Sequence, residues 1–206
     1  MWHRSCLAAS LYLMLGGAAL AQPAPPDADW PCRQRLVPEL TAGGLWNGPP
    51  PPADRKWQDD KRIAGLVTSV SSRDLPVDEG KAQLNKFADG VKPAERKVIL
   101  PEIFAGIVDE VNRQRGEVIA RLREMTRRQR DIGDVVAKVT TELQQIPETA
   151  EGADAQRRAE IVQRRNYVIR AFEETEHTMR YACEVPVALE ARLGDYARLL
   201  QGKLGG

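Results

Sequence analysis

The sequence predicts an all-α protein: a long antiparallel coiled-coil helical hairpin, with short helices and a proline-rich extended strap packed at its base. Three observations predict this fold. An apolar seven-residue repeat runs through the second half of the chain, prolines gather ahead of it, and the 206 residues are 29% charged but only 5% aromatic. A hydrophobic share of 42% is enough for one domain with a core, and the composition favours charged helices over a β-sandwich.

Residues 1–21 are predicted to be a secretory signal peptide. His3 and Arg4 precede an apolar run, and Ala19-Leu20-Ala21 has the small-x-small pattern of a cleavage site. An uncleaved membrane anchor is the alternative, but the apolar run of about fifteen residues is shorter than the roughly twenty that span a bilayer. We therefore expect a periplasmic or secreted protein with no stable membrane insertion after signal cleavage.

Cleavage also changes the charge and the cysteine count. Lys plus Arg falls from 30 to 29 when Arg4 is removed, which equals the 29 Asp plus Glu, so non-specific binding to nucleic acid or membrane surfaces is not expected. Cys6 is removed as well. Cys32 and Cys183 remain, and in an exported protein such a pair predicts a disulfide, which in the chain-entropy model stabilises by roughly 5 kcal/mol. Two thiols that never meet are the alternative.

Residues 22–53 form a proline-rich segment that is predicted to be extended, because proline fixes φ and lacks an N–H group. Such a segment could be a ligand for a proline-recognition module. Its apolar residues instead favour a strap that lies against the helices and is joined to them through Cys32. These apolar residues are Leu36, Val37, Leu40, Leu45 and Trp46.

Two short helices are expected over residues 54–92, at the start of a helical domain that covers residues 54–206. The first has Trp57 as an upstream anchor, and the second has Asp74 as its N-cap with Pro76 in its first turn. Their apolar stripes are Ile63, Leu66, Val67 and Val70, and Leu84, Phe87, Ala88 and Val91.

The coiled-coil hairpin is predicted over residues 101–185. Two sets of positions recur every seven residues with an offset of four, which keeps one face of a helix against a partner helix. Arg115 and Gln129 interrupt this seam. A polar seam residue can set the register or the oligomeric state; alternatively, Arg115 extends its charge to water and Gln129 lies near the edge. The sets are Phe104, Val111, Val118, Met125, Ile132, Val139 and Ile146, and Val108, Arg115, Leu122, Gln129, Val136 and Leu143.

The ends of these helices are expected at prolines and cap residues. The long helix begins at Pro93 or at Pro101 and ends before Pro147. Asp154 is the expected N-cap of the return helix, which ends near Val185.

A terminal helix is expected over residues 187–204, after a bend at Pro186. Its apolar stripe would pack beside the strap and the two short helices.

The charges of the two hairpin helices are predicted to be complementary. If the chain reverses near residue 150, facing positions total roughly 300, so the basic run at 113–130 faces the acidic run at 170–187. We therefore expect these arginines to pair within the chain rather than to bind nucleic acid. The charged residues are Arg113, Arg115, Arg121, Arg123, Arg127, Arg128 and Arg130, and Glu173, Glu174, Glu176 and Glu184.

No residue set for catalysis or for a cofactor stands out. Glu174 and His177 have the Glu-x-x-His spacing of di-iron bundles, but such a site needs a second motif and the mature chain has no second histidine. The few serines suggest no catalytic triad, and no phosphate loop, CxxC pair or EF-hand pattern is present. We therefore predict a non-enzymatic protein with no catalytic residues, no cofactor and no metal site.

Four short motifs resemble those of a group of uncharacterised exported helical proteins of proteobacteria. The resemblance covers the mature chain and implies no activity and no functional residues. It is consistent with a bond between Cys32 and Cys183. The motifs are Asp29-Trp30-Pro31-Cys32, Trp46-x-Gly48-Pro49, Asn112-x-x-Arg115 and Cys183-Glu184-x-Pro186.

The function that we expect is protein binding or scaffolding by a disulfide-clamped hairpin, with a cell-envelope protein or a second copy as the partner. Arg115, Gln129, Trp46 and Trp57 are the candidate contact residues. One alternative is a holdase-type chaperone with an apolar groove near the hairpin base. The other is a metal-binding protein or enzyme at the Glu-x-x-His motif of the return helix.

Overall fold

The computed structural model describes residues 27–205, and every regular element within them is a helix, which confirms the predicted all-α class. The predicted signal peptide, and the proline-rich segment as far as residue 26, lie outside the described residues. The elements are the 3-10 helices η1 (Ala42–Gly44) and η2 (Trp57–Asp59) and the α-helices α1 (Lys61–Ser71), α2 (Val77–Asp89), α3 (Pro93–Gln144), α4 (Gly152–Ala182) and α5 (Glu184–Gly202).

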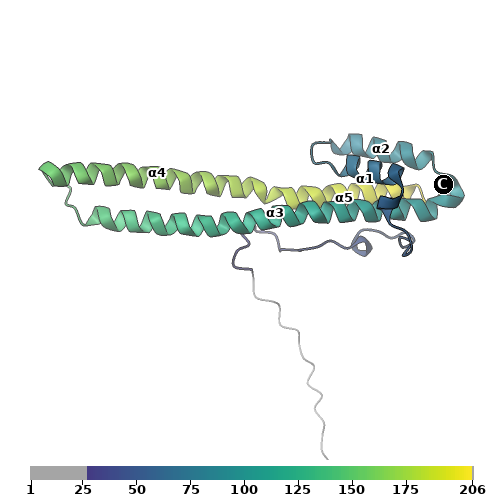
Figure 1. Cartoon of the computed structure of the whole chain (residues 1–206), viewed down its shortest axis with the longest axis horizontal. Helices are drawn as coiled ribbons and strands as arrows, with labels where there is room; N and C mark the ends of the chain where they lie inside the picture. The colour runs from purple at the N-terminus through teal and green to yellow at the C-terminus, as the bar shows by residue number, and fades with distance from the viewer. Residues whose placement is uncertain (1–26, 206) are drawn as a thin grey trace, which may run out of the picture.

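The long helix α3 organises the rest of the fold. Its 52 residues make it about 78 Å long at 1.5 Å per residue. The chain reverses over residues 145–151, after which α4 and then α5 return along α3, separated only by Cys183 (Figure 1). We call α3 and α4 the hairpin, the turn at 145–151 its tip, and the end where α1, α2 and α5 gather its base.

α3 begins at Pro93, the first of the two expected starting points, and Pro101 lies inside the helix. A proline in a helix interior removes one backbone hydrogen bond and costs about 3 kcal/mol. Here the neighbouring Leu100, Ile103 and Phe104 are all buried in the base, and their burial offsets that cost.

Both expected N-caps are wrong. Pro76 has φ −55° and ψ 141°, so helical backbone begins only at Val77, and the Asp74 side chain lies too far upstream to cap it. In α4 the helix already begins at Gly152, which adopts a positive φ of 60° that glycine tolerates. Asp154 therefore lies in the first turn, where its charge favours the helix dipole.

The last helix also starts earlier than expected. α5 begins at Glu184, so Pro186 lies in its first turn rather than ahead of it. A backbone N–H in the first turn has no acceptor within its own helix. Proline, which lacks this N–H, is therefore tolerated at that position.

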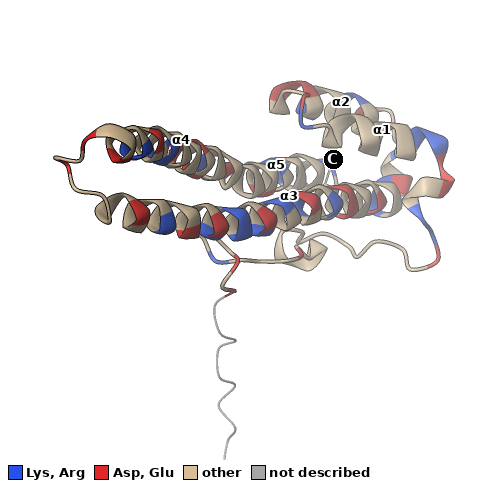
Figure 2. Cartoon of the chain, turned by 60° about the vertical axis from the view of Figure 1, so that its left-hand side comes forward, with Lys and Arg blue, Asp and Glu red and all other residues tan. Residues whose placement is uncertain are grey.

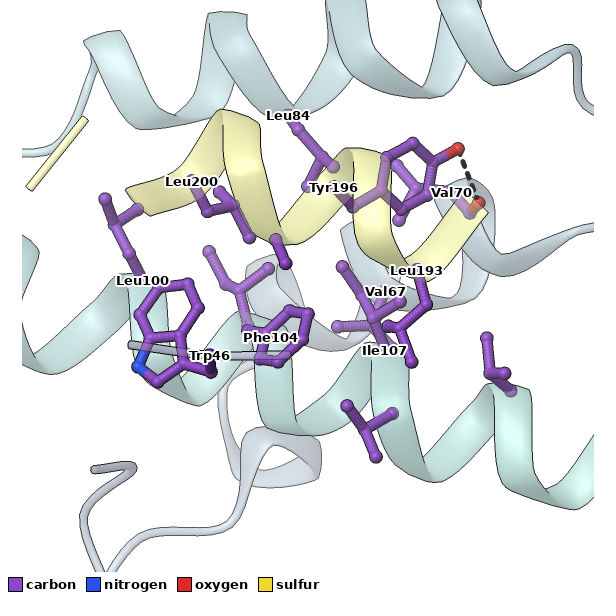
Figure 3. Packing of buried hydrophobic residues seen from close by; sticks show 14 of the residues in the cluster. Trp46, Val67, Val70, Leu84, Leu100, Phe104, Ile107, Leu193, Tyr196 and Leu200 are labelled. Carbon is purple, nitrogen blue, oxygen red and sulfur yellow. Dashed lines mark hydrogen bonds between the residues drawn. The ribbon is translucent and has the colours of Figure 1, made fainter. Parts of the chain in front are cut away.

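The main core lies at the base, between α1, α2, α5 and the first part of α3 (Figure 3). Tyr196 is its largest fully buried side chain, and the hydroxyl donates a hydrogen bond of 3.1 Å to the carbonyl of Val70. Gly80 makes room for this ring, because a Cβ there would lie 1.9 Å from the tyrosine oxygen. The fully buried residues include Ile63, Val67, Val70, Leu84, Ala88, Leu193 and Leu200.

The hairpin beyond the base is covered much less. Every position of the two predicted seven-residue sets is buried or half-buried, so that face of α3 lies against its neighbours. Near the tip, Val139, Leu143 and Ile161 form a small second core. In α4, however, only Ile161 and Met179 are buried, which leaves most of this helix in contact with solvent.

Candidate functional site

The strap runs along α3 in the opposite direction. Asp29 pairs with Arg130, Leu40 meets Asn112, and Trp46 stacks on Phe104, so rising residue numbers in the strap meet falling ones in α3. Figure 1 shows this path from the middle of the hairpin to the base. Between residues 27 and 53 the strap consists of irregular backbone with turns and bends, and η1 is its only helical element.

A disulfide joins Cys32 to Cys183, as predicted from the cysteine count, with a Cα–Cα distance of 5.5 Å. Cys183 is the residue between α4 and α5, so the bond attaches the strap where these helices meet. Next to it, the Gln34 amide donates a 2.6 Å hydrogen bond to the carbonyl of Cys183. The strap is therefore held at this point both covalently and by a hydrogen bond.

Arg115 connects the strap, α3 and α5. Its guanidinium donates hydrogen bonds of 2.8 Å to the carbonyls of Val37 and Pro186, and the residue is only 3% exposed. Burial lowers the pKa of Arg115, against an opposing effect of Glu190, whose carboxylate is 3.9 Å away. The side chain does not extend its charge to water, so that alternative does not hold for Arg115.

Gln129 connects α3 to α4 in a similar way. Its amide nitrogen donates a 3.0 Å hydrogen bond to the carbonyl of Phe172, and the residue is 9% exposed. The two residue numbers add up to 301, both for Gln129 with Phe172 and for Arg115 with Pro186. This agrees with the total of roughly 300 expected for facing positions. Both polar seam residues thus bind backbone carbonyls of the returning chain.

Three of the four short motifs named in the sequence analysis converge on this region, whereas Trp46 of the fourth stacks on Phe104 in the base core. The Asn112 side chain accepts from the N–H of Leu40 at 2.9 Å and donates to its carbonyl at 2.8 Å, as a neighbouring strand would. The Trp30 indole donates to the carbonyl of Gln34 at 2.8 Å. We call the contacts of Trp30, Cys32, Gln34, Val37, Leu40, Asn112, Arg115, Cys183 and Pro186 the strap junction.

The two candidate tryptophans also pack against α3, Trp46 from the strap and Trp57 from η2. Trp46 is 6% exposed, stacks on Phe104 with a centroid distance of 4.9 Å, and donates to the carbonyl of Pro49 at 2.7 Å. Trp57 is half-buried; it donates to Asp109 at 2.9 Å and packs against Gly106, where a Cβ would lie 2.8 Å from the ring.

The candidate residues Arg115, Gln129, Trp46 and Trp57 therefore make contacts within the chain. The expectation that they also contact a partner stays a prediction. In the described part of the chain, each of them helps to hold neighbouring segments together.

The arginines of α3 pair within the chain, but the expected partners are wrong. Arg123 pairs with Asp27 at 2.6 Å, and Arg127 and Arg130 pair with Asp29 at 2.8 and 2.5 Å. These interactions lower the pKa of both carboxyl groups; for Asp27 the largest cause is the backbone N–H of Asp29. No ion pair within residues 27–205 joins the basic run to the expected glutamates of α4 and α5.

The reason lies in the position of these arginines on the helix. Arg123, Arg127 and Arg130 fall between the seam positions, on the side of α3 that faces away from α4. Figure 2 shows acidic and basic residues along both hairpin helices. The outward-facing arginines meet the strap, and Arg113 and Arg128 pair with acids of α3 itself.

α4 presents the most exposed large hydrophobic side chains of the described structure. Tyr167 is 69% exposed and Tyr181 is 60% exposed. The His177 ring contacts Tyr181 edge-on, with centroids 4.7 Å apart. Arg170 and Glu174 lie between the tyrosines and form no ion pair with any other described residue.

Glu174 and His177, the pair singled out by the Glu-x-x-His spacing, are both exposed on this helix. Within residues 27–205 no group of three or more His, Cys, Asp or Glu side chains is placed to hold a metal ion.

Two open grooves lie beside the hairpin. One, of about 880 Å³, runs past the disulfide between strap, α4 and α5, and is lined by Cys32, Met179, Val187 and Ala188 among others. The other, of about 500 Å³, lies halfway along the hairpin, lined by Gly133, Val136, Ile169, Phe172, Glu173 and Glu176. Both grooves are thus lined in part by apolar side chains.

Among the described residues, none of the helices combines the length and the hydropathy needed to cross a membrane. The resemblance to exported proteobacterial proteins stays a prediction. Comparison of the chain with protein-family models, with curated proteins and with solved structures found no match.

Proposed function

We propose that this protein is an exported binding or scaffolding protein, without enzymatic activity, in which α3 and α4 pair as an antiparallel coiled coil. In this proposal the base and the strap junction hold the hairpin rigidly, and α4 presents a side face to a protein partner in the cell envelope. The proposed location is the periplasm or the extracellular space, because the Cys32–Cys183 disulfide needs an oxidising compartment.

One observation carries this proposal: α4 is 31 residues long but buries only Ile161 and Met179. A helix that served only to complete a core would bury a continuous apolar stripe. Instead its exposed large hydrophobic side chains are tyrosines, a residue type enriched at protein interfaces because it combines an apolar ring with a hydrogen-bonding group.

Site-specific photocrosslinking in cells that produce the protein naturally tests this function. A photoreactive residue at Tyr167 or Tyr181 is expected to give defined crosslinked species, identified by mass spectrometry. The matched control is the same residue at Val98, an exposed apolar position in the base part of α3, which is expected to give none.

Equal crosslinking from all three positions, or none from α4, would count against a partner on the hairpin. Fractionation of the same cells tests the location. Recovery of the oxidised protein from the cytoplasm would contradict export.

A holdase-type chaperone is the second candidate, and the groove beside the disulfide favours it. Met179, Val187 and Ala188 line this groove, and Val187 is 52% exposed, so apolar surface is available to an unfolded client. Near-stoichiometric protein should then suppress the aggregation of an unrelated unfolding protein, and Val187→Glu should abolish the effect. Unchanged aggregation in the presence of the wild-type protein removes this candidate.

A further inference from the structure

A row of exposed side chains follows α4 on the side away from α3. Its members are spaced alternately by three and four residues, which places them on one face of the helix, and every one of them is exposed. We call this row the outer stripe. It consists of Glu160, Gln163, Tyr167, Arg170, Glu174, His177 and Tyr181.

The outer stripe repeats the spacing of a coiled-coil seam on a face that has no partner in the described structure. The seven-residue pattern of α3 faces the returning helix, whereas this second pattern faces solvent. Its two tyrosines are 69% and 60% exposed, and aromatic side chains of this kind are typical anchors of interfaces.

The charge of α4 is divided along its length. From residue 152 to 170 it carries five arginines and two acidic residues, a net charge of +3; from 171 to 182 it carries three glutamates and one arginine, a net charge of −2 with histidine neutral. Two such helices repel when they lie parallel in register and attract when they lie antiparallel.

We propose that the outer stripe binds the outer stripe of a second copy of this chain, with the two α4 helices antiparallel about a two-fold axis. The inference deepens the proposed function by naming the partner, and it rests on that function. In the register where paired residue numbers total 344, Arg170 meets Glu174 of the second copy twice, and Tyr167 meets His177 of the second copy twice. Gln163 then faces Tyr181 of the second copy.

This register follows from the spacing of the stripe. In an antiparallel pair, each residue of one seam position faces a residue of the other position, and the total of 344 satisfies this for the six stripe residues from Gln163 to Tyr181. Arg170 and Glu174 have no ion pair within the described residues, so pairing between copies gives each a partner without breaking an existing contact. The interface is isologous, as two-fold symmetry requires.

Sedimentation of the purified, oxidised protein over a wide concentration range tests the proposal. The wild-type protein is expected to form a dimer. Arg170→Glu and Glu174→Arg each place like charges opposite one another in both symmetric contacts, and each is expected to raise the dissociation constant about tenfold or more. The double variant R170E/E174R restores opposite charges in both contacts and is expected to restore the dimer.

Arg121→Glu is the matched control, since Arg121 is an exposed arginine of α3 outside the stripe, and it should leave the dissociation constant unchanged. If circular dichroism shows that a charge reversal lowers helicity, R170Q and E174Q replace it and should weaken the dimer by a smaller factor.

A wild-type monomer at all concentrations overturns self-pairing. So does a dimer that both single reversals leave unchanged, or one that the double variant fails to restore, because the interface then lies elsewhere. The photocrosslinking test remains independent: a different protein crosslinked at Tyr167 would support the proposed function even when the purified chain is monomeric.

Discussion

Removing the Arg115 guanidinium should destabilise the fold more than the loss of any exposed arginine. Arg115→Met keeps the apolar part of the side chain but leaves the carbonyls of Val37 and Pro186 without their donor. Hydrogen bonds from a charged donor contribute about 1.5–3 kcal/mol each, so two give about 3–6 kcal/mol. The buried charge of Arg115 is itself unfavourable, and its Nε has no partner among the described atoms, so removing the group recovers part of this energy. We therefore expect the free energy of unfolding to fall by about 3 kcal/mol.

Urea unfolding of the oxidised protein measures this loss. With an m-value of about 2 kcal/mol/M for a domain of this size, the midpoint of Arg115→Met should fall by about 1.5 M. Arg115→Lys should recover part of the loss, because a single ammonium group cannot reproduce both directed contacts. Arg121→Met is the control, and its midpoint should change by less than about 0.3 M. A shift equally small for Arg115→Met would refute the bridging role.

Three further predictions concern the disulfide and the core. Replacing Cys32 and Cys183 by serine should lower the free energy of unfolding by about 5 kcal/mol in urea, since the bond spans 151 residues; a loss below about 1 kcal/mol would contradict the entropic argument. Gly80→Ala should cost about 3 kcal/mol in thermal unfolding because its Cβ would overlap the Tyr196 hydroxyl, whereas Gly116→Ala, with open space around it, should stabilise by about 1 kcal/mol; equal effects would disprove the steric explanation. Burial raises the pKa of Tyr196, so the unfolded chain releases a proton above about pH 10 that the folded protein retains, and stability should fall as pH rises through that range; a Tyr196→Phe variant with the same pH dependence in urea unfolding would contradict this.

The seam of α3 could be predicted because burial on a helix leaves a periodic signal. Phe104, Val111 and Leu122 are buried where the repeat places them, and the polar seam residues Arg115 and Gln129 are buried as well. The disulfide could be predicted for a different reason. Removal of the predicted signal peptide would leave two cysteines, which allow only one intramolecular pairing.

The path of the strap could not be predicted, because its contacts leave no pattern in the sequence. Proline indicates an extended backbone but gives no direction, and the contacts of Asn112 and Arg115 go to backbone groups that every residue carries. The arginine partners were missed for a related reason. Opposite runs of charge predict attraction between segments, but Arg123 and Arg127 face away from α4 and meet the strap instead.

The outer stripe did leave a signal in the sequence. Tyr167 and Tyr181 are fourteen positions apart, which is two full heptads, so they must share a helix face. Ile161 and Met179, the buried residues of α4, occupy other positions of the seven-residue repeat. The tyrosines therefore mark the outward face, and the buried residues mark the face that contacts α3.

Because α3 belongs both to the base core and to the projecting hairpin, without interruption, it acts mechanically as a lever. From Val111, where it leaves the core, to its end at Gln144, it extends about 50 Å at 1.5 Å per residue. A tilt of about 5° within the base would displace the tip by about 4 Å over that length. Small changes in base packing are thereby amplified into movements of the far end that are as large as a side chain.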